Sequence, residues 1–190
     1  MDNQNRLKKF KEKVFTRSMV KVSIFCLLCL GFMYSSNKLF YLNVSASMPI
    51  GIYARIPGDS YRVGDIVTYH ITDDVLELSL GRGYLPEDDK GIMKMKDAML
   101  VKTIGALAGD TYGVDGRDEF FINGKKVGGI DEIDSQGRRM PVQRGKHVVE
   151  DGKFLPYAKP VNSLDGRYIG TVPLDRIECR LVPIITTRGE

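Results

Sequence analysis

Tryptophan is absent from this chain of 190 residues, and histidine and cysteine are scarce, with two and three residues respectively. A zinc site usually draws its ligands from Cys and His side chains at short, regular spacings. The one such pair, Cys26 and Cys29, falls within an apolar segment, where thiols behave as small apolar side chains, so no pair indicates a ligand motif. The sequence therefore predicts no metal site and no cofactor.

The chain also lacks a basic surface outside its N-terminus. Residues 1–21 contain seven basic and two acidic side chains, whereas the rest of the chain is close to neutral. A nucleic-acid-binding domain needs its positive charge clustered on a folded face. Because the excess positive charge belongs to the N-terminal run, we expect no nucleic-acid partner.

An uncharged apolar segment, residues 22–34, follows the basic run. It is shorter than the roughly 20 residues that span a hydrocarbon core, and its length suits the apolar region of a cleaved export signal. However, apolar character resumes at residues 39–42, and no clean small-x-small cleavage site follows Tyr34. If Lys21 snorkels to the interface, residues 19–42 are long enough for an uncleaved anchor, which is the interpretation we favour.

The basic flank keeps the N-terminus of such an anchor in the cytoplasm. The sequence thus predicts a basic cytoplasmic tail (residues 1–18), one transmembrane helix (19–42) and an exported domain (43–190). In a bacterium the domain lies on the periplasmic side of the inner membrane, with membrane lipid as a partner. Cys179 is the single cysteine of that domain, so we expect no disulfide within it, whereas an intermolecular bridge stays open.

From residue 43 onward the pattern is mainly that of strands and turns, which predicts a mainly β fold. Residues 73–80 are a candidate short helix, and residues 128–144 a candidate long loop. Asn123-Gly124 is a two-residue turn signal that predicts a hairpin over residues 119–127. Further candidate strands are residues 51–56, 66–71, 98–110 and 146–150.

Two serines in alternate positions, Ser45 and Ser47, precede Met48-Pro49. Proline lacks an N–H and disfavours the α conformation of the residue before it, so the serines are expected on an extended segment or a turn. In an extended segment their hydroxyls point to the same side, where one can act and the other assist. A serine pair is common in loops, so this pattern indicates catalysis only if another segment supplies a base.

Lys102 is the candidate base. In an extended strand it shares a face with Leu100 and Ile104, and such surroundings lower the pKa of an amine from its usual ~10.4. A neutral amine can accept a proton from a serine. The alternative is a lysine whose stem is buried while its amine reaches water. A Ser-His-Asp triad using His70 or His147 is a further alternative, although neither histidine has a carboxylate motif beside it.

A third segment, Asn162-Ser-Leu-Asp-Gly-Arg-Tyr-Ile-Gly170, brings Ser163, Asp165 and Arg167 close together. Asp165-Gly166 predicts a turn, and Arg167 can pair with Asp165 and fix the loop. Ser163 can exchange a hydrogen bond with a nearby amine. On its own, such a segment is most often a structural turn.

Together, three segments resemble the main boxes of the signal peptidase I family of Ser/Lys proteases, in the family's order and after an anchor. They are Ser45-Ala-Ser-Met-Pro49, Leu100-Val-Lys-Thr-Ile-Gly-Ala-Leu-Ala-Gly-Asp110 and the segment from Asn162 to Gly170. The spelling Met48-Pro49-Ile-Gly-Ile-Tyr53 is similar to the TraF-type peptidases of conjugative plasmids, which process pilin precursors, in some systems into rings. Gly166 departs from the leader-peptidase pattern, in which serine is usual.

The resemblance implies a signal-peptidase-like antiparallel β-sheet domain behind one transmembrane helix, and it implies roles for four residues. Ser47 is then the nucleophile and Lys102 the general base. Ser163 orients the lysine amine. The Ser47 N–H and the Ser45 hydroxyl hold the oxyanion.

The same resemblance implies supporting and substrate-binding residues. Asp165 and Arg167 form an ion pair that holds Ser163 in place. The substrate binds as an added strand, with small side chains before the scissile bond in shallow pockets, and Met48 and Pro49 are the substrate-binding residues.

The predicted function is a membrane-anchored serine endopeptidase that processes membrane-inserted pilin precursors for conjugative transfer. Attack of an amine instead of water on the acyl-enzyme would give a cyclic product. One alternative is a general type I signal peptidase that acts on many exported preproteins. The other is a non-catalytic, membrane-tethered β-domain of a secretion or conjugation apparatus, which would tolerate loss of the Lys102 amine.

Overall fold

The computed structural model describes residues 19–25, 31, 38–85 and 98–187. It divides into two units, residues 1–40 and 41–190. In the first unit, residues 19–25 are helical, and most of their apolar side chains are exposed. Across the ranges that the structure describes, no helix has both the length and the apolar character needed to cross a membrane. The predicted tail and much of the predicted anchor, including Cys26 and Cys29, lie outside the described residues.

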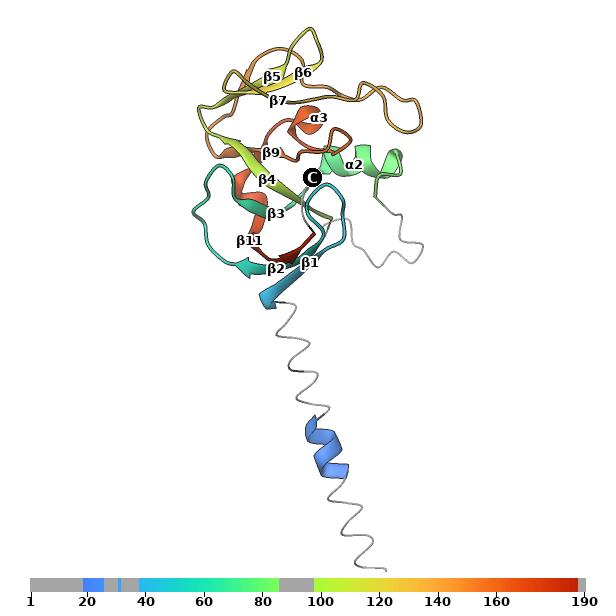
Figure 1. The fold of residues 1–190 in the computed structure, drawn as a ribbon, viewed down its shortest axis with the longest axis vertical. Coiled ribbons are helices and arrows are strands. Elements are labelled where there is room, and N and C mark those ends of the chain that lie inside the picture. Colours follow the sequence, from blue (N-terminus) through green and yellow to red (C-terminus); the bar gives the residue numbers. More distant parts are fainter. Residues whose placement is uncertain (1–18, 26–30, 32–37, 86–97, 188–190) are drawn as a thin grey trace, which may run out of the picture. The chain divides into compact units, whose positions relative to one another are not determined.

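The second unit is built on two sheets whose strands pair antiparallel, so the mainly β expectation is confirmed (Figure 1). The larger sheet has the strand order β1-β2-β11-β3-β4-β9-β10. Its strands are β1 (Phe40–Asn43), β2 (Gly51–Ile56), β3 (Ile66–His70), β4 (Met99–Leu107), β9 (Lys153–Tyr157), β10 (Val172–Pro173) and β11 (Ile177–Thr186).

The smaller sheet has the order β7-β6-β5-β8. Its strands are β5 (Thr111–Val114), β6 (Glu119–Ile122), β7 (Lys125–Gly129) and β8 (His147–Val148). The turn between β6 and β7 has positive φ at both central residues, 49° at Asn123 and 74° at Gly124. Both values suit a two-residue hairpin turn, so the predicted hairpin is confirmed.

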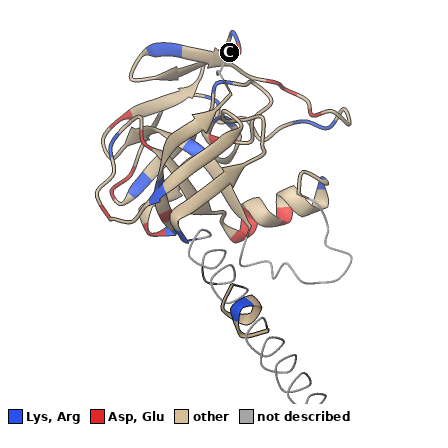
Figure 2. Ribbon diagram, turned by 60° about the horizontal axis from the view of Figure 1, so that its bottom comes forward, with Lys and Arg blue, Asp and Glu red and all other residues tan. Residues whose placement is uncertain are grey.

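Helices are few among the described residues of this unit. They are α2 (Asp73–Gly81), α3 (Gly166–Ile169) and the 3₁₀ turn η2 (Leu174–Arg176). The predicted short helix at residues 73–80 is confirmed as α2, whose first turn carries Asp73 and Asp74, where negative charge stabilises a helix (Figure 2). The turn expected at Asp165-Gly166 is instead the start of α3. Its N-cap, Asp165, accepts a hydrogen bond from the Arg167 N–H.

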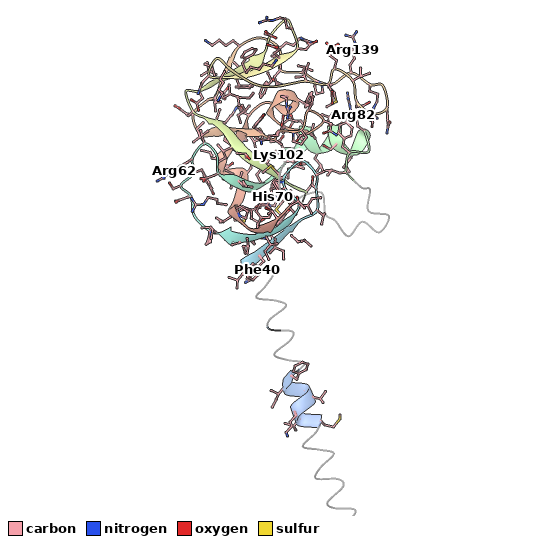
Figure 3. All side chains as sticks on the ribbon, viewed as in Figure 1. Phe40, Arg62, His70, Arg82, Lys102 and Arg139 are labelled. Carbon is pink, nitrogen blue, oxygen red and sulfur yellow. The ribbon has the colours of Figure 1, made fainter. Side chains whose placement is uncertain are left out.

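In the core, β4 lies next to the segment that carries Ser45 and Ser47. Val67 of β3 is fully buried and lies directly opposite Lys102 in the β3–β4 register. Lys102 is 3% exposed, whereas Arg62 and Arg139 project at the edge of the domain (Figure 3). Residues directly opposite in an antiparallel pair share a face, so the lysine stem packs on the buried face of the sheet.

Cys179 lies on β11 within the same core. Its thiol is 4% exposed and lies 3.2 Å from the Thr68 hydroxyl. It packs in one apolar cluster with Met48 and Tyr53. Because a buried thiol is out of reach of another molecule, an intermolecular bridge at this cysteine requires the sheet to open.

Candidate active site

The two serines lie in a turn that follows β1. Of the two conformations expected before Pro49, an extended segment or a turn, the structure has the turn. The Met48 N–H donates to the Ser45 carbonyl at 3.4 Å, and the Ser45 and Ser47 hydroxyl oxygens are 3.0 Å apart. The Met48 side chain is buried in the core beside Tyr53, whose hydroxyl donates to the Pro49 carbonyl at 2.6 Å. The turn is thereby attached to the sheet at its far end.

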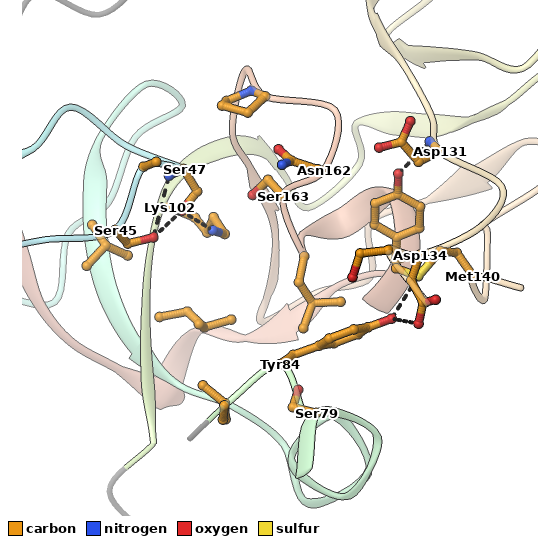
Figure 4. Close-up of a pocket in the computed structure, with 18 of the residues that line it drawn as sticks. Ser45, Ser47, Ser79, Tyr84, Lys102, Asp131, Asp134, Met140, Asn162 and Ser163 are labelled. Atoms are coloured by element: carbon orange, nitrogen blue, oxygen red, sulfur yellow. Dashed lines mark hydrogen bonds between the residues drawn. The ribbon is translucent and has the colours of Figure 1, made fainter. Parts of the chain in front are cut away.

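β4 directs Lys102 at this turn. The Lys102 Nζ atom lies 2.8 Å from the Ser47 Oγ atom, within hydrogen-bond distance (Figure 4). Burial lowers the pKa of Lys102 from its ordinary value of 10.5 to about 8, an effect that the charge of Asp165 opposes. Part of the population therefore has a neutral amine near physiological pH, at bonding distance from a serine hydroxyl.

Ser163 lines the same cavity as Lys102. Its side chain is 3% exposed, and among the described residues its Oγ atom has no hydrogen-bond partner. A buried hydroxyl whose donor and acceptor capacities are both free can accept a hydrogen bond from one of the N–H groups of a nearby amine. In this structure, however, the amine of Lys102 is bonded to Ser47.

Asp165 and Arg167 form a fully buried ion pair just beyond Ser163. Arg167 Nε is 2.9 Å from one carboxylate oxygen of Asp165, and Nη2 is 2.7 Å from the other. The guanidinium also donates to the carbonyls of Ala158 and Pro160, and the Ala158 N–H donates to Asp165 at 2.9 Å. These bonds hold both ends of the loop that carries Ser163.

A family model described as "Signal peptidase, peptidase S26" matches residues 13–185, nearly the whole chain. The chain belongs to this peptidase family. Membership implies a serine peptidase of the signal peptidase type, and such peptidases are typically associated with membranes. A comparison with curated proteins finds no match.

This signal peptidase family member has glycine at position 166, where the leader-peptidase pattern has serine. Packing around Gly166 explains the difference. A Cβ atom at this glycine would lie 2.4 Å from Leu155 Cδ1 and 2.8 Å from the Pro156 carbonyl oxygen. Both distances are shorter than any ordinary carbon contact. β9 therefore occupies the space that a serine side chain would need.

The sequence did not indicate which residues line the active-site cavity on the side opposite the serine turn. The cavity holds about 570 Å³, and its far side includes Tyr84, Asp134 and Met140 (Figure 4). The Tyr84 hydroxyl donates to Asp134 at 2.8 Å, and Arg138 Nε donates to the same carboxylate at 2.7 Å. The Tyr84–Asp134 bond attaches the loop after β7 to the segment that follows α2. No local sequence pattern indicates it, since the two residues are 50 positions apart.

The remaining candidates are not among the residues that line this cavity. Met48 and Pro49 are two of them, and their role in substrate binding stays a prediction. Neither His70 nor His147 lines it. His147 instead stacks on Tyr112 and bonds to a backbone carbonyl. Within the described part of this peptidase, the basic group at the serine turn is thus the lysine.

Proposed function

We propose that this chain is a membrane-anchored serine endopeptidase with a Ser47–Lys102 dyad, and that its substrates are membrane-inserted pilin precursors. The single observation that carries the proposal is the 2.8 Å separation between a buried amine and the Ser47 hydroxyl. At that distance a neutral amine takes the hydroxyl proton as the serine oxygen attacks the scissile carbonyl.

The remaining steps follow from the same groups. The tetrahedral oxyanion accepts hydrogen bonds from the Ser47 N–H and the Ser45 hydroxyl, and the protonated Lys102 then gives its proton to the departing amine. The product is an ester between Ser47 and the substrate. Water restores the enzyme by hydrolysing this ester, and a substrate amine in place of water would give a joined or cyclic peptide.

Membrane attachment rests on residues 19–42 and on their basic flank. Apolar side chains are also exposed on the domain itself, where Ile52 of β2 lies directly opposite Ile185 of β11. Exposed apolar neighbours of this kind suit contact with lipid rather than water. Because the basic flank favours a cytoplasmic N-terminus, we propose that the domain lies at the periplasmic face of a bacterial inner membrane.

Pilin precursors are proposed as the substrates because the motif Met48-Pro49-Ile-Gly-Ile-Tyr53 resembles that of the TraF-type peptidases. Two of these residues serve the fold. A Cβ at Gly51 would lie 2.1 Å from the Ile185 carbonyl oxygen, and Tyr53 bonds to Pro49. Substrate identity therefore needs a direct measurement.

We expect a pilin precursor co-expressed with the full chain to be trimmed, as read by mass spectrometry, and to stay intact with Ser47→Ala. A product lighter by one further water identifies a cyclic peptide. Ser60→Ala, at an exposed serine outside the cavity, is the matched control and should trim normally. Trimming that survives Ser47→Ala would contradict the proposed nucleophile. Trimming of many unrelated preproteins would instead identify a general signal peptidase.

The pH profile is expected to follow the amine. Since the active form of Lys102 is neutral and its pKa is about 8, kcat/KM should rise with pH through about 8 and level off above it. A peptide substrate measured across this range with purified full-length enzyme in detergent gives the profile. A histidine base would instead place the inflection near ~6.5. A profile that is already flat at neutral pH would therefore contradict the lysine as base.

A further inference from the structure

Asn43, the last residue of β1, has a buried side chain directly under the serine turn, with 2% of its surface exposed. Its Nδ2 atom lies within hydrogen-bond distance of three carbonyl oxygens, those of Ser45 at 3.0 Å, Met48 at 3.1 Å and Pro49 at 3.1 Å. Its Oδ1 atom accepts from the Ser45 N–H at 3.1 Å. One side chain thus ties the start of the turn to its end.

The orientation of this carboxamide follows from its neighbours. A carboxamide has two N–H hydrogens, so three carbonyl acceptors share them, and the reversed orientation would set an oxygen against three oxygens. All polar atoms of Asn43 are then occupied by the backbone of the turn. The residue acts through the turn, because none of its polar atoms is left to bind a substrate.

Few other hydrogen bonds fix the backbone of the turn, although the Met48 side chain is buried in the core and Lys102 bonds to the Ser47 hydroxyl. The one backbone hydrogen bond that closes it, from Met48 to Ser45, is long at 3.4 Å. The Tyr53 hydroxyl holds only the Pro49 carbonyl. The Ser47 N–H points at the Ser45 Oγ atom across a similarly long 3.4 Å. Because this bond is weak, the Ser47 N–H can leave it and donate to a stronger acceptor. It can do so only if the turn holds the N–H in position.

We propose that Asn43 is a positioning residue that fixes the serine turn so that the Ser47 N–H and the Ser45 hydroxyl converge on the oxyanion of the reaction. The proposal rests on the peptidase function proposed above. Donors stabilise a transition state most when they are held in place before the charge develops. Asn43 supplies that rigidity, because its bonds bracket Ser47 on both sides.

The test compares full-length Asn43→Asp, which keeps the shape but turns the donor into an oxygen, with wild type. We expect kcat to fall about 10²–10³-fold while KM changes little, since the two donors that the turn positions bind the oxyanion only in the transition state. Affinity for a peptide aldehyde, whose adduct with the serine carries the oxyanion, should fall in parallel with kcat/KM. Affinity for the cleaved product peptide, which carries no oxyanion adduct, should stay within about threefold, a split that simple destabilisation does not produce.

Thr187→Val is the matched control. It removes the side-chain hydrogen bond to the Ile50 N–H, just beyond the turn, and should leave kcat within about twofold. If Asn43→Asp does not give the wild-type circular dichroism spectrum, Asn43→Ser keeps one donor and should show a smaller loss of the same kind. Normal kcat in a folded Asn43 variant, or equal losses for aldehyde and product peptide, would overturn the proposal. Inactive wild type, or an active Ser47→Ala variant, would instead overturn the peptidase function.

Discussion

Replacing Lys102 with methionine is expected to abolish peptidase activity and to stabilise the fold at the same time. Methionine keeps the length and apolar character of the lysine stem but cannot accept the Ser47 proton. Removal of a general base that acts as a unit with its nucleophile costs at least about 10³-fold in kcat. The same change removes an amine that is 3% exposed and bonded to Ser47.

The gain in stability follows from proton linkage. The pKa of Lys102 is about 8 in the folded protein and 10.5 ordinarily, so the unfolded chain binds more protons between these values. Stability contributed by this residue is therefore lowest below pH 8 and rises as the pH increases to about 10.5. At neutral pH this difference corresponds to about 3 kcal/mol, and we expect Lys102→Met to recover about 2–3 kcal/mol of unfolding free energy.

Urea unfolding of the full chain in detergent, followed by circular dichroism because tryptophan is absent, measures this gain. Lys126→Met is the control, since that lysine pairs with Glu119 at the surface and has a side chain 56% exposed. It should change stability by less than about 1 kcal/mol. A Lys102→Met protein that keeps wild-type peptidase activity would contradict Lys102 as the general base. An inactive variant that is less stable would contradict the buried neutral amine.

The sequence contained enough information for the local structure around this dyad. The Asn123-Gly124 turn and the β-branched run of β3 are signals that depend on neighbouring residues only. The alternation around Lys102 correctly placed it on the same face as Leu100 and Ile104, because strand periodicity fixes which residues share a face. What periodicity alone left open was whether the amine reaches water, and the structure places it in the protein, against Ser47.

Contacts between distant segments were not accessible from the sequence. The link from Tyr84 to Asp134 depends on how the loop after β7 packs beside α2. The role of Asn43 depends on a turn whose conformation the Met48-Pro49 signal left undecided. A buried asparagine at a strand end gives no signal in composition or periodicity, although its place just before a serine pair is a pattern that a search for caps and turn anchors would notice.

Loss of the guanidinium in Arg167→Met is expected to destabilise the domain more than any other change discussed. Arg167 and Asp165 are both fully buried, and the arginine also donates to the carbonyls of Gly129, Ala158 and Pro160. Its removal leaves a buried carboxylate without its counter-charge and carbonyls without donors. Breaking a buried pair in this way costs about 3–5 kcal/mol, a large share of the stability of a single domain.

A surface pair with the same spacing provides the control. Arg117 and Asp115 are also two residues apart, and the Arg117 N–H also donates to the carboxylate, but the Arg117 side chain is 80% exposed. Arg117→Met should therefore cost less than about 1 kcal/mol in the same urea titration. Because Asp165 and Arg167 fix the loop that carries Ser163, the Arg167→Met protein should also lose activity under conditions where it is still folded. Equal stability losses at the two pairs would show that burial does not set the strength of the inner one.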